Sequence, residues 1–175
     1  MIRKRNALSP VRVVFRWKRI AVTIHANRLP GGGYEITLVS LQNNTRAALS
    51  GAVSAGCQYP FVRRIRRFLD GEERDLSDMP ICIKGFTPFR RKATEAARRI
   101  PWGTTVSYAG LACMAGFPSA ARAVASVMRR NPFPLIVPCH RVICADGKIG
   151  GFAGKISGKQ IEIKRMLLRR EGVRV

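Results

Sequence analysis

The pattern of apolar residues changes from strand-like to helical along the chain, and this change limits the folds that it can adopt. Three segments of the first third are rich in Val, Ile and aromatic residues, as β-strands are: residues 12–17, 20–26 and 34–41. From residue 61 onwards, apolar residues recur at helical spacing. We therefore expect a mixed fold of the α/β class (α+β), with a small β-rich N-terminal domain and a mainly helical C-terminal domain.

A polar stretch separates the two halves. Phe61–Leu69 has helical spacing and ends at the helix-stopping pair Asp70-Gly71. Residues 72–80 are polar and show no periodicity, which predicts a linker. We place one domain at residues 1–84 and the other at residues 85–175.

Capping residues mark the helices of the second domain. Pro88–Ile100 has Thr87 as its expected N-cap and a proline in its first position. Two short helices follow, Ser107–Ala115 and Ser119–Arg130, each expected to begin at a serine cap. They are joined by Gly116-Phe117-Pro118, and we expect the proline to start the second helix. Such a pair is typical of a helix-turn-helix unit.

The second helix of this pair has one face suited to packing and one suited to a partner. The expected packing face is apolar and contains Ala123, Val124, Val127 and Met128. The opposite face contains Ser119, Arg122, Ser126 and Arg129. From the helix alone, a solvated surface arginine is the simpler interpretation of Arg122.

The chain carries a large positive charge. Its 32 Lys and Arg residues against 10 Asp and Glu leave a formal net charge of +22. A charge of this size favours a polyanionic partner, with nucleic acid ahead of an anionic membrane surface. The alternative is that the basic residues only keep the protein soluble.

One cysteine, Cys139, lies beside His140 inside an apolar run. The thiolate is the nucleophilic form of cysteine, and a neighbouring base generates it. By itself the pair is compatible with a protease, a redox sensor or a metal ligand. The five cysteines include no CxxC pair and there are two histidines, so we expect neither a metal nor a cofactor.

Three further segments lie around this pair in the sequence. Asn131 precedes a proline, and a simple helix C-cap explains it equally well. The glycine-rich loop 147–154 lacks the spacing of phosphate-binding loops. A last helix is expected at about residues 158–170. Glu171 lies one turn beyond its leucines, where it could orient a histidine, although an acid at a helix end is usually solvated.

Targeting signals are not evident in the sequence. Met1–Arg5 is basic but lacks the apolar stretch of a signal peptide. No apolar run approaches the roughly 20 residues of a membrane-spanning helix. We expect an intracellular protein that is cytoplasmic and nucleoid-associated, or nuclear in a eukaryote.

Several motifs occur together, in an order and spacing that are specific. They are Thr87-Pro88-Phe89, Pro101-Trp102-Gly103, Val106-Ser107-Tyr108, Ala121–Val124, Asn131-Pro132, Pro138–Val142 with the letters PCHRV, and the glycine-rich loop. Over about residues 61–173 the chain resembles the DNA alkyltransferases that repair 6-O-alkylguanine (methylated-DNA–protein-cysteine methyltransferases). The resemblance implies a ribonuclease-H-like N-terminal domain and a winged-helix-like helix-turn-helix. The first 60 residues of the chain match this family only in being β-rich.

The resemblance implies a reaction and a role for each residue. Cys139 would take the alkyl group from 6-O-alkylguanine, and more weakly from 4-O-alkylthymine, in a single irreversible turnover. His140 would draw off the thiol proton through a water, and Glu171 would hold His140 in the right tautomer. Tyr108 would protonate or hydrogen-bond the leaving guanine, and Asn131 would brace the turn under the site.

The resemblance also implies a DNA contact and a substrate pocket. Double-stranded DNA would bind a monomer through its minor groove, and Arg122 would fill the space left by the extruded nucleotide. The DNA-binding residues would be Ser119, Arg122, Ala123, Ser126, Arg129 and Tyr108. The pocket would consist of Pro138, Val142, Ile149, Gly150, Gly151, Phe152, Ala153 and Gly154, with the carbonyls of Cys139 and Val142 accepting from the guanine amine.

The chain departs from the family pattern at two positions. Ala153 stands where many members carry a serine, and Lys155 stands where a glycine is common. The main alternative is a non-catalytic, alkyltransferase-like protein that binds the lesion, but those proteins replace the cysteine. A cysteine hydrolase and a helix-turn-helix regulator are further alternatives. Cys57 and Cys82 are expected to be small buried residues, and Cys113 an ordinary helix residue.

Overall fold

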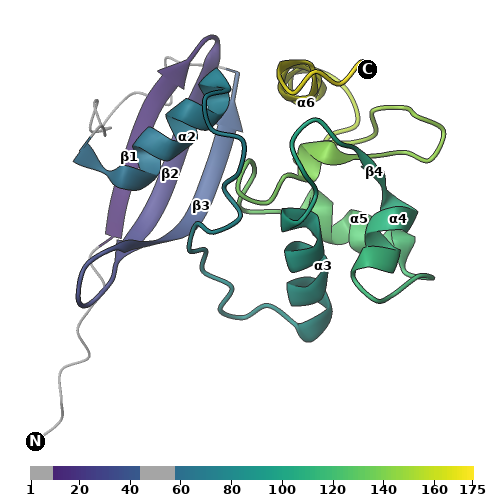
Figure 1. Cartoon of the computed structure of the whole chain (residues 1–175), viewed down its shortest axis with the longest axis horizontal. Helices are drawn as coiled ribbons and strands as arrows, with labels where there is room; N and C mark the ends of the chain where they lie inside the picture. Colours follow the sequence, from purple (N-terminus) through teal and green to yellow (C-terminus); the bar gives the residue numbers. More distant parts are fainter. Residues whose placement is uncertain (1–9, 44–57) are drawn as a thin grey trace, which may run out of the picture.

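The N-terminal part is a small antiparallel sheet covered by one helix. The structure is a computed structural model that describes residues 10–43 and 58–175 (Figure 1). Met1–Arg5 and Cys57, on which the sequence raised expectations, lie outside the described residues. The sheet has the order β1-β2-β3, with bounds β1 Pro10–Trp17, β2 Ile20–Arg28 and β3 Tyr34–Gln42. All three predicted strands are confirmed.

Helix α2, Pro60–Asp70, lies across this sheet (Figure 1). Its buried side chains share one face and recur at helical spacing: Phe61, Val62, Ile65, Phe68 and Leu69. The helix ends at Gly71, whose φ of 79° is the left-handed conformation of a glycine C-cap. The Trp17 indole N–H donates to the Asp70 carboxylate at 2.9 Å, which joins the end of β1 to the end of α2. The predicted helix and its stop are both confirmed.

The segment after α2 is more than a linker. Leu76 and Met79 are buried. The Ile36 N–H donates to the Pro80 carbonyl at 2.9 Å, and the Cys82 N–H donates to the Ile36 carbonyl at 2.8 Å. The segment is therefore attached to the edge of β3, which a polar sequence without periodicity does not reveal. The domain division at residues 84 and 85 stays a prediction.

The C-terminal part consists of short helices and two very short strands. Their bounds are α3 Pro88–Arg98, β4 Val106–Ser107, α4 Tyr108–Met114, α5 Ala121–Arg129, the 3-10 turn η2 Cys139–Arg141, β5 Val142–Ile143 and α6 Lys159–Arg170. Two predicted caps are confirmed. The Thr87 side chain accepts from the Arg90 N–H, and the Ser107 side chain accepts from the Gly110 N–H at 3.0 Å.

Three predictions about α5 are wrong. The helix begins at Ala121 with Ala120 as its N-cap, so Ser119 is not the cap and Pro118 does not start the helix. The cause is a turn closed by the Ala120 N–H on the Phe117 carbonyl at 2.9 Å, which delays the helix by two residues. Ala123 is exposed, because the buried stripe of α5 is Val124, Val127 and Met128, at helical spacing, and Ala123 lies outside it.

The expected α/β class (α+β) is confirmed by this combination of a small antiparallel sheet and helices. Strands β4 and β5 pair in parallel, with Val106 opposite Val142 and Ser107 opposite Ile143. This pairing holds the start of α4 against the segment that follows Cys139. Among the described residues, no helix combines the length and apolar character needed to cross a membrane.

Two serine substitutions test the helix boundaries. We expect Ser107→Ala to lower the free energy of unfolding by about 1 kcal/mol, because the Gly110 N–H loses its acceptor. Ser119→Ala is the matched control and should change it by less than about 0.5 kcal/mol, since Ser119 is exposed and caps nothing. Urea unfolding of both variants provides the comparison. Equal losses at the two serines would contradict the assigned start of α5.

Candidate active site

Cys139 begins a single 3-10 turn at the end of a buried run. Residues 133–138 are all buried, and the Cys139 side chain itself remains only slightly accessible, with a residue exposure of 6%. The Cys139 N–H donates to the Val137 carbonyl at 2.7 Å, and the Arg141 N–H donates to the Pro138 carbonyl at 2.9 Å. The thiol is thus held by a tightly bonded backbone and not by a flexible loop.

The Asn131 side chain joins the end of α5 to the thiol. Its amide nitrogen donates to the Val137 carbonyl at 2.8 Å and to the Cys139 sulfur at 3.1 Å. Its amide oxygen accepts from the Phe133 N–H at 2.9 Å. All the hydrogen-bonding atoms of one asparagine side chain therefore brace this turn and the nucleophile, beyond what a helix C-cap requires.

Glu171 is the centre of a buried hydrogen-bond network. Its carboxylate accepts from Arg141 at 2.9 Å on each oxygen and from the Gly103 N–H at 3.1 Å. His140 Nε2 lies 2.8 Å from the same carboxylate. Arg141 also donates to the Ile100 carbonyl at 2.6 Å. An ionised carboxylate with these donors holds the proton of His140 on Nε2.

The other ring nitrogen of His140 is the one free to act as a base. His140 is fully buried, and its Nδ1 has no hydrogen-bond partner among the described residues. Burial lowers the pKa of His140 below 6.5, so the imidazole is neutral at pH 7. With Nε2 protonated toward Glu171, Nδ1 carries the lone pair.

Burial and hydrogen bonds together set the protonation of three other groups. Burial raises the pKa of the Cys139 thiol above 9, although the Asn131 hydrogen bond acts in the opposite direction, so the resting form is the thiol. It raises the pKa of Tyr108 to about 12, so the phenol keeps its proton and is a donor. For Glu171, burial would raise the pKa, but the hydrogen bonds from His140 and Arg141 lower it to about 2.

A buried lysine lies behind the site. The Lys164 amine donates to the Val142 carbonyl at 2.6 Å and to the Gly151 carbonyl at 3.1 Å. These bonds tie α6 both to the strand after Cys139 and to the glycine-rich loop. Burial lowers the pKa of Lys164 to about 8, which leaves it mostly protonated at pH 7.

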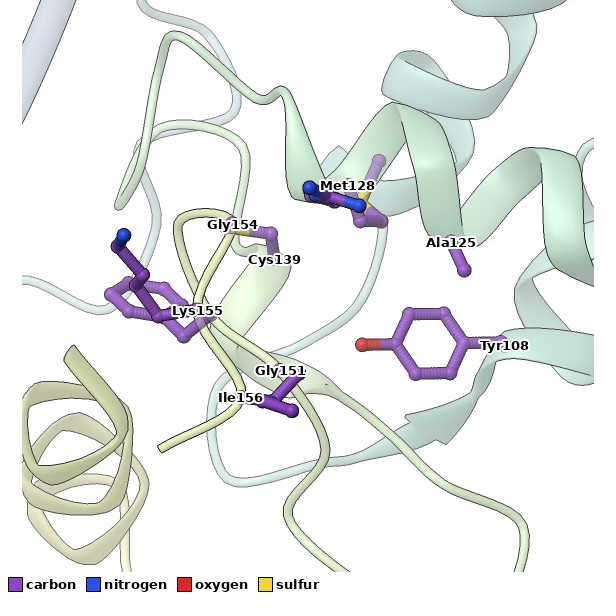
Figure 2. Close-up of a pocket in the computed structure, with 10 residues that line it drawn as sticks. Tyr108, Ala125, Met128, Cys139, Gly151, Gly154, Lys155 and Ile156 are labelled. Carbon is purple, nitrogen blue, oxygen red and sulfur yellow. The ribbon is translucent and has the colours of Figure 1, made fainter. Parts of the chain in front are cut away.

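A cavity of about 440 Å³ opens at Cys139. Figure 2 shows Tyr108 on one side with its hydroxyl pointing into the cavity, and the loop with Gly151, Lys155 and Ile156 on another. The lining residues are Tyr108, Ala125, Met128, Arg129, Cys139, Gly151, Phe152, Gly154, Lys155 and Ile156. The cavity is large enough for a flat organic group, presented between a nucleophile and a phenol donor.

The structure brings only part of the expected pocket to this cavity. Gly151, Phe152 and Gly154 line it, whereas Pro138, Val142, Ile149, Gly150 and Ala153 do not. Pro138 and Val142 are buried, and the Val142 carbonyl already accepts from Lys164. Ala153 is exposed with a φ of 46°, because a tight turn closed between Phe152 and Lys155 directs it to solvent.

Apart from Tyr108, which begins α4 and lines the cavity, the expected DNA-facing residues lie on α5 or in the turn before it. Arg122, Ala123 and Arg129 are exposed on the helix, and Ser126 is half-buried. Arg129 also borders the cavity, so this face and the cavity adjoin. Ser119 is exposed but lies in the turn before the helix.

Sequence reasoning missed six residues of the site. Arg141, Lys164, Ala125, Met128, Lys155 and Ile156 were given no role in it. A signal for Lys164 was present, since it interrupts the apolar stripe of Ile161 and Leu168 at helical spacing. Lys155 and Ile156 reach the cavity through a tight turn, which periodicity does not predict.

The other cysteines of the described residues, Cys82, Cys113 and Cys144, are free thiols, and Cys144 lies close to Tyr108. Cys113 is exposed, and Cys82 and Cys144 are half-buried. Cys82 is thus less buried than expected. Among the described residues, no group of three or more His, Cys, Asp and Glu side chains is arranged to hold a metal ion.

Residues 88–173 match the family described as "6-O-methylguanine DNA methyltransferase, DNA binding domain". A relative from Methanothermobacter thermautotrophicus, named methylated-DNA–protein-cysteine methyltransferase, is 40% identical over 109 residues, which are 62% of this chain and 58% of the relative. The match therefore spans less than two thirds of that relative's length.

Two further similarities extend this result. A Thermus thermophilus protein named "DNA base-flipping protein" is 42% identical over 108 residues, which are 62% of this chain and 69% of that protein. The solved structure of Mycobacterium tuberculosis OGT in complex with DNA gives a TM-score of 0.71 at 29% identity, covering 92% of each chain.

The charge on Glu171 should stabilise the protein. We expect Glu171→Gln to lower the free energy of unfolding at pH 7 by about 3 kcal/mol, because Arg141 then keeps a buried charge without its partner. The pKa of Glu171 falls from 4.5 to about 2 on folding, so its stabilisation is complete above pH 4.5 and disappears as the pH falls through 2. The difference between wild type and variant should shrink over that window.

Guanidinium unfolding at pH 7, 4 and 3 measures this difference. The control is Glu72→Gln, which removes an exposed ion pair with Arg67 and should cost less than about 1 kcal/mol at each pH. A Glu171→Gln protein as stable as wild type would show that the carboxylate charge does not hold the network together.

Proposed function

Because the chain belongs to the 6-O-methylguanine DNA methyltransferase family, we propose that it repairs DNA by direct reversal of alkylation damage. It transfers the alkyl group of 6-O-alkylguanine, and more weakly of 4-O-alkylthymine, to its own Cys139. The observation that carries this proposal is the Cys139 thiol at the wall of the cavity, with Asn131 bonded to its sulfur and a phenol donor lining the same cavity.

The proton of the thiol must leave before transfer, because burial keeps Cys139 protonated at rest. The acceptor is His140 Nδ1, reached through one bridging water, and the imidazolium later releases the proton to solvent because burial lowers the pKa of His140. Glu171 stabilises the imidazolium that forms, since its carboxylate already lies 2.8 Å from Nε2. Arg141 keeps that carboxylate ionised throughout.

The displacement itself exchanges one bond for another. The sulfur attacks the alkyl carbon, an S–C bond forms, and the C–O6 bond breaks with its electron pair on guanine. Tyr108 then donates a hydrogen bond or its proton to the leaving base, which lowers the charge in the transition state. The products are S-alkylcysteine and guanine; the guanine anion takes its proton from Tyr108 or from solvent, and solvent restores the proton of Tyr108 where the phenol gave it.

The reaction ends there, since a thioether has no good leaving group. Each protein molecule thus acts once. Because Cys139 reacts once, His140 need not return a proton to a product.

Double-stranded DNA is the proposed partner of the α5 face. A base in the stack cannot present its O6 substituent to a buried thiol, so the nucleotide must be extruded at a cost of a few kcal/mol. Arg122 is exposed on α5 and would fill the gap in the stack from the minor groove. The net charge of +22 would offset the cost through phosphate contacts that are independent of sequence. We propose that the protein binds and repairs DNA as a monomer, in the cytoplasm at the nucleoid or, in a eukaryote, in the nucleus.

The alternative is a protein that binds the lesion without transfer, and the relative named "DNA base-flipping protein" makes it a serious one. Against it stands the cysteine, with the histidine, glutamate and asparagine that such chemistry needs arranged around it. A binding protein would gain nothing from this arrangement.

Mass spectrometry tests the transfer. After incubation with a duplex carrying 6-O-methylguanine, we expect a mass increase of about 14 Da, one CH₂, on Cys139, at one per molecule. Cys139→Ala should abolish it and keep DNA binding, whereas Cys113→Ala, the loss of an exposed thiol, should change nothing. Multiple turnover, or an unmodified wild type that still binds, would overturn the proposal.

The variant Arg122→Ala tests whether Arg122 supports extrusion of the alkylated nucleotide from the duplex. We expect transfer from duplex DNA to slow on the order of tenfold or more, since part of the flipping cost is no longer offset. Transfer from the free alkylated base should keep its rate. Arg63→Ala, which removes an exposed arginine of α2, is the matched control and should leave both rates unchanged. Equal slowing with duplex and free base would exclude a stack-filling role.

A further inference from the structure

Most of the positive charge lies away from the proposed DNA face of α5. Of the residues expected there, Arg122 and Arg129 are the cations. A second concentration of cations lines the space between the β1–β2 turn and α6, which we call the α6 basic groove. Its main cations are Arg16, Lys18, Arg19, Lys159, Arg165 and Arg169.

The groove is one continuous feature. It consists of adjoining hollows, each of which is bordered by both Lys18 and Glu162. Figure 1 places α6 near the end of the sheet where β1 turns into β2, whereas α4 and α5 lie on another side of the molecule. Segments more than 100 residues apart in sequence thus contribute cations to one surface.

These cations are not neutralised within the protein. In residues 10–43 and 58–175, none of the six makes an ion pair within 4.0 Å, and Glu162 is the one carboxylate lining the groove. The surface of α2 differs, because Arg64 there pairs with Glu73 and Asp78. Unpaired like charges repel one another and destabilise the fold, so an external anion is the natural complement.

The backbone at Lys18 supports this reading. Lys18 has a φ of 51°, the left-handed region that favours glycine or asparagine in a two-residue hairpin turn. A lysine there stores backbone strain, and such strain tends to persist where function requires the side chain. Its amine lies 4.9 Å above the Trp17 ring, and the residue is exposed.

The groove faces away from the active site. Lys164 points toward the site, since its amine bonds the Val142 and Gly151 carbonyls. At about 100° per residue, Glu162 and Arg169 lie about 140° to 160° around α6 from Lys164. A duplex whose base occupies the cavity at Cys139 therefore does not cover this groove.

We infer that the α6 basic groove binds the phosphate backbone of a second duplex, separate from the duplex that holds the lesion. The inference rests on the proposed function for its choice of DNA as the polyanion. A second duplex would keep the protein close to DNA while the α5 face releases one site and samples another, by raising the effective concentration. The groove is lined mainly by Lys and Arg side chains, which suits phosphate contact independent of sequence.

A bridging assay tests this inference. An undamaged duplex is fixed to beads and saturated with protein, and retention of a second, fluorescent duplex is measured against salt. We expect wild type to retain it. The groove variant Lys18→Gly/Arg165→Gln/Arg169→Gln should lose most of the retention, and the log–log salt slope should fall by about three, one for each phosphate contact removed.

Matched variants distinguish an effect of the α6 basic groove from an effect of the total positive charge. Arg12→Gln/Arg63→Gln/Lys84→Gln removes three exposed cations elsewhere and should bridge as wild type does. Glu162→Gln removes the one acid of the groove and should strengthen retention. Lys18→Gly alone relieves the strained turn, so it should melt no lower than wild type and still bridge less well.

The outcomes are decisive in both directions. Retention by the groove variant, or equal loss in the control variant, would overturn the inference, including the case where bridging comes from protein–protein contact. If the groove variant bridges but no longer binds phosphatidylglycerol vesicles, the groove serves a membrane and the inference is wrong. Transfer from free 6-O-methylguanine is measured on the same samples: its loss in every protein would refute the proposed function and leave the bridging result standing.

Discussion

The buried carboxylate of Glu171 is the interaction on which the rest of the site depends. It brings together the end of α6, the loop at Gly103 and the turn that carries Cys139. A buried anion is costly unless several donors surround it, and here the permanently charged Arg141 meets it with two hydrogen bonds. The same contacts that offset its burial also fix the orientation and tautomer of His140. Stability and chemistry thus rest on one set of bonds.

A second constraint acts from the other side of the thiol. Asn131 holds the sulfur and the connector before it, and the buried Leu135 of that connector has a φ of 77°, a strained value for a branched residue. Packing and the bond from the Val137 N–H to the Phe133 carbonyl maintain this conformation. Two rigid supports, Asn131 and Glu171, therefore place a thiol and a base without a flexible element between them, as preorganised catalysis requires.

Much of this arrangement was predictable because it follows local rules. The apolar periodicity predicted the strands and α2, and the capping residues predicted α3 and α4. The spacing of the leucines in α6 predicted that Glu171 could point inward. The errors lie at short hydrogen-bonded turns between the regular elements. The turn at Phe117 delays α5 and leaves Ser119 without a cap role, and the turn at Phe152 brings Ile156 to the cavity. Neither turn produces a periodic pattern of apolar residues in the sequence.

The central claim is that His140, held by Glu171, takes the proton of Cys139. The most direct test is the pH dependence of single-turnover methyl transfer from a duplex carrying 6-O-methylguanine, followed by quenched flow. The lowered pKa of His140 and the raised pKa of Cys139 predict a rate that stays level from about pH 6.5 to 8.5 and falls only where His140 gains a proton. A rate that rises about tenfold per pH unit across that range would contradict the claim, because the thiol would then ionise without His140.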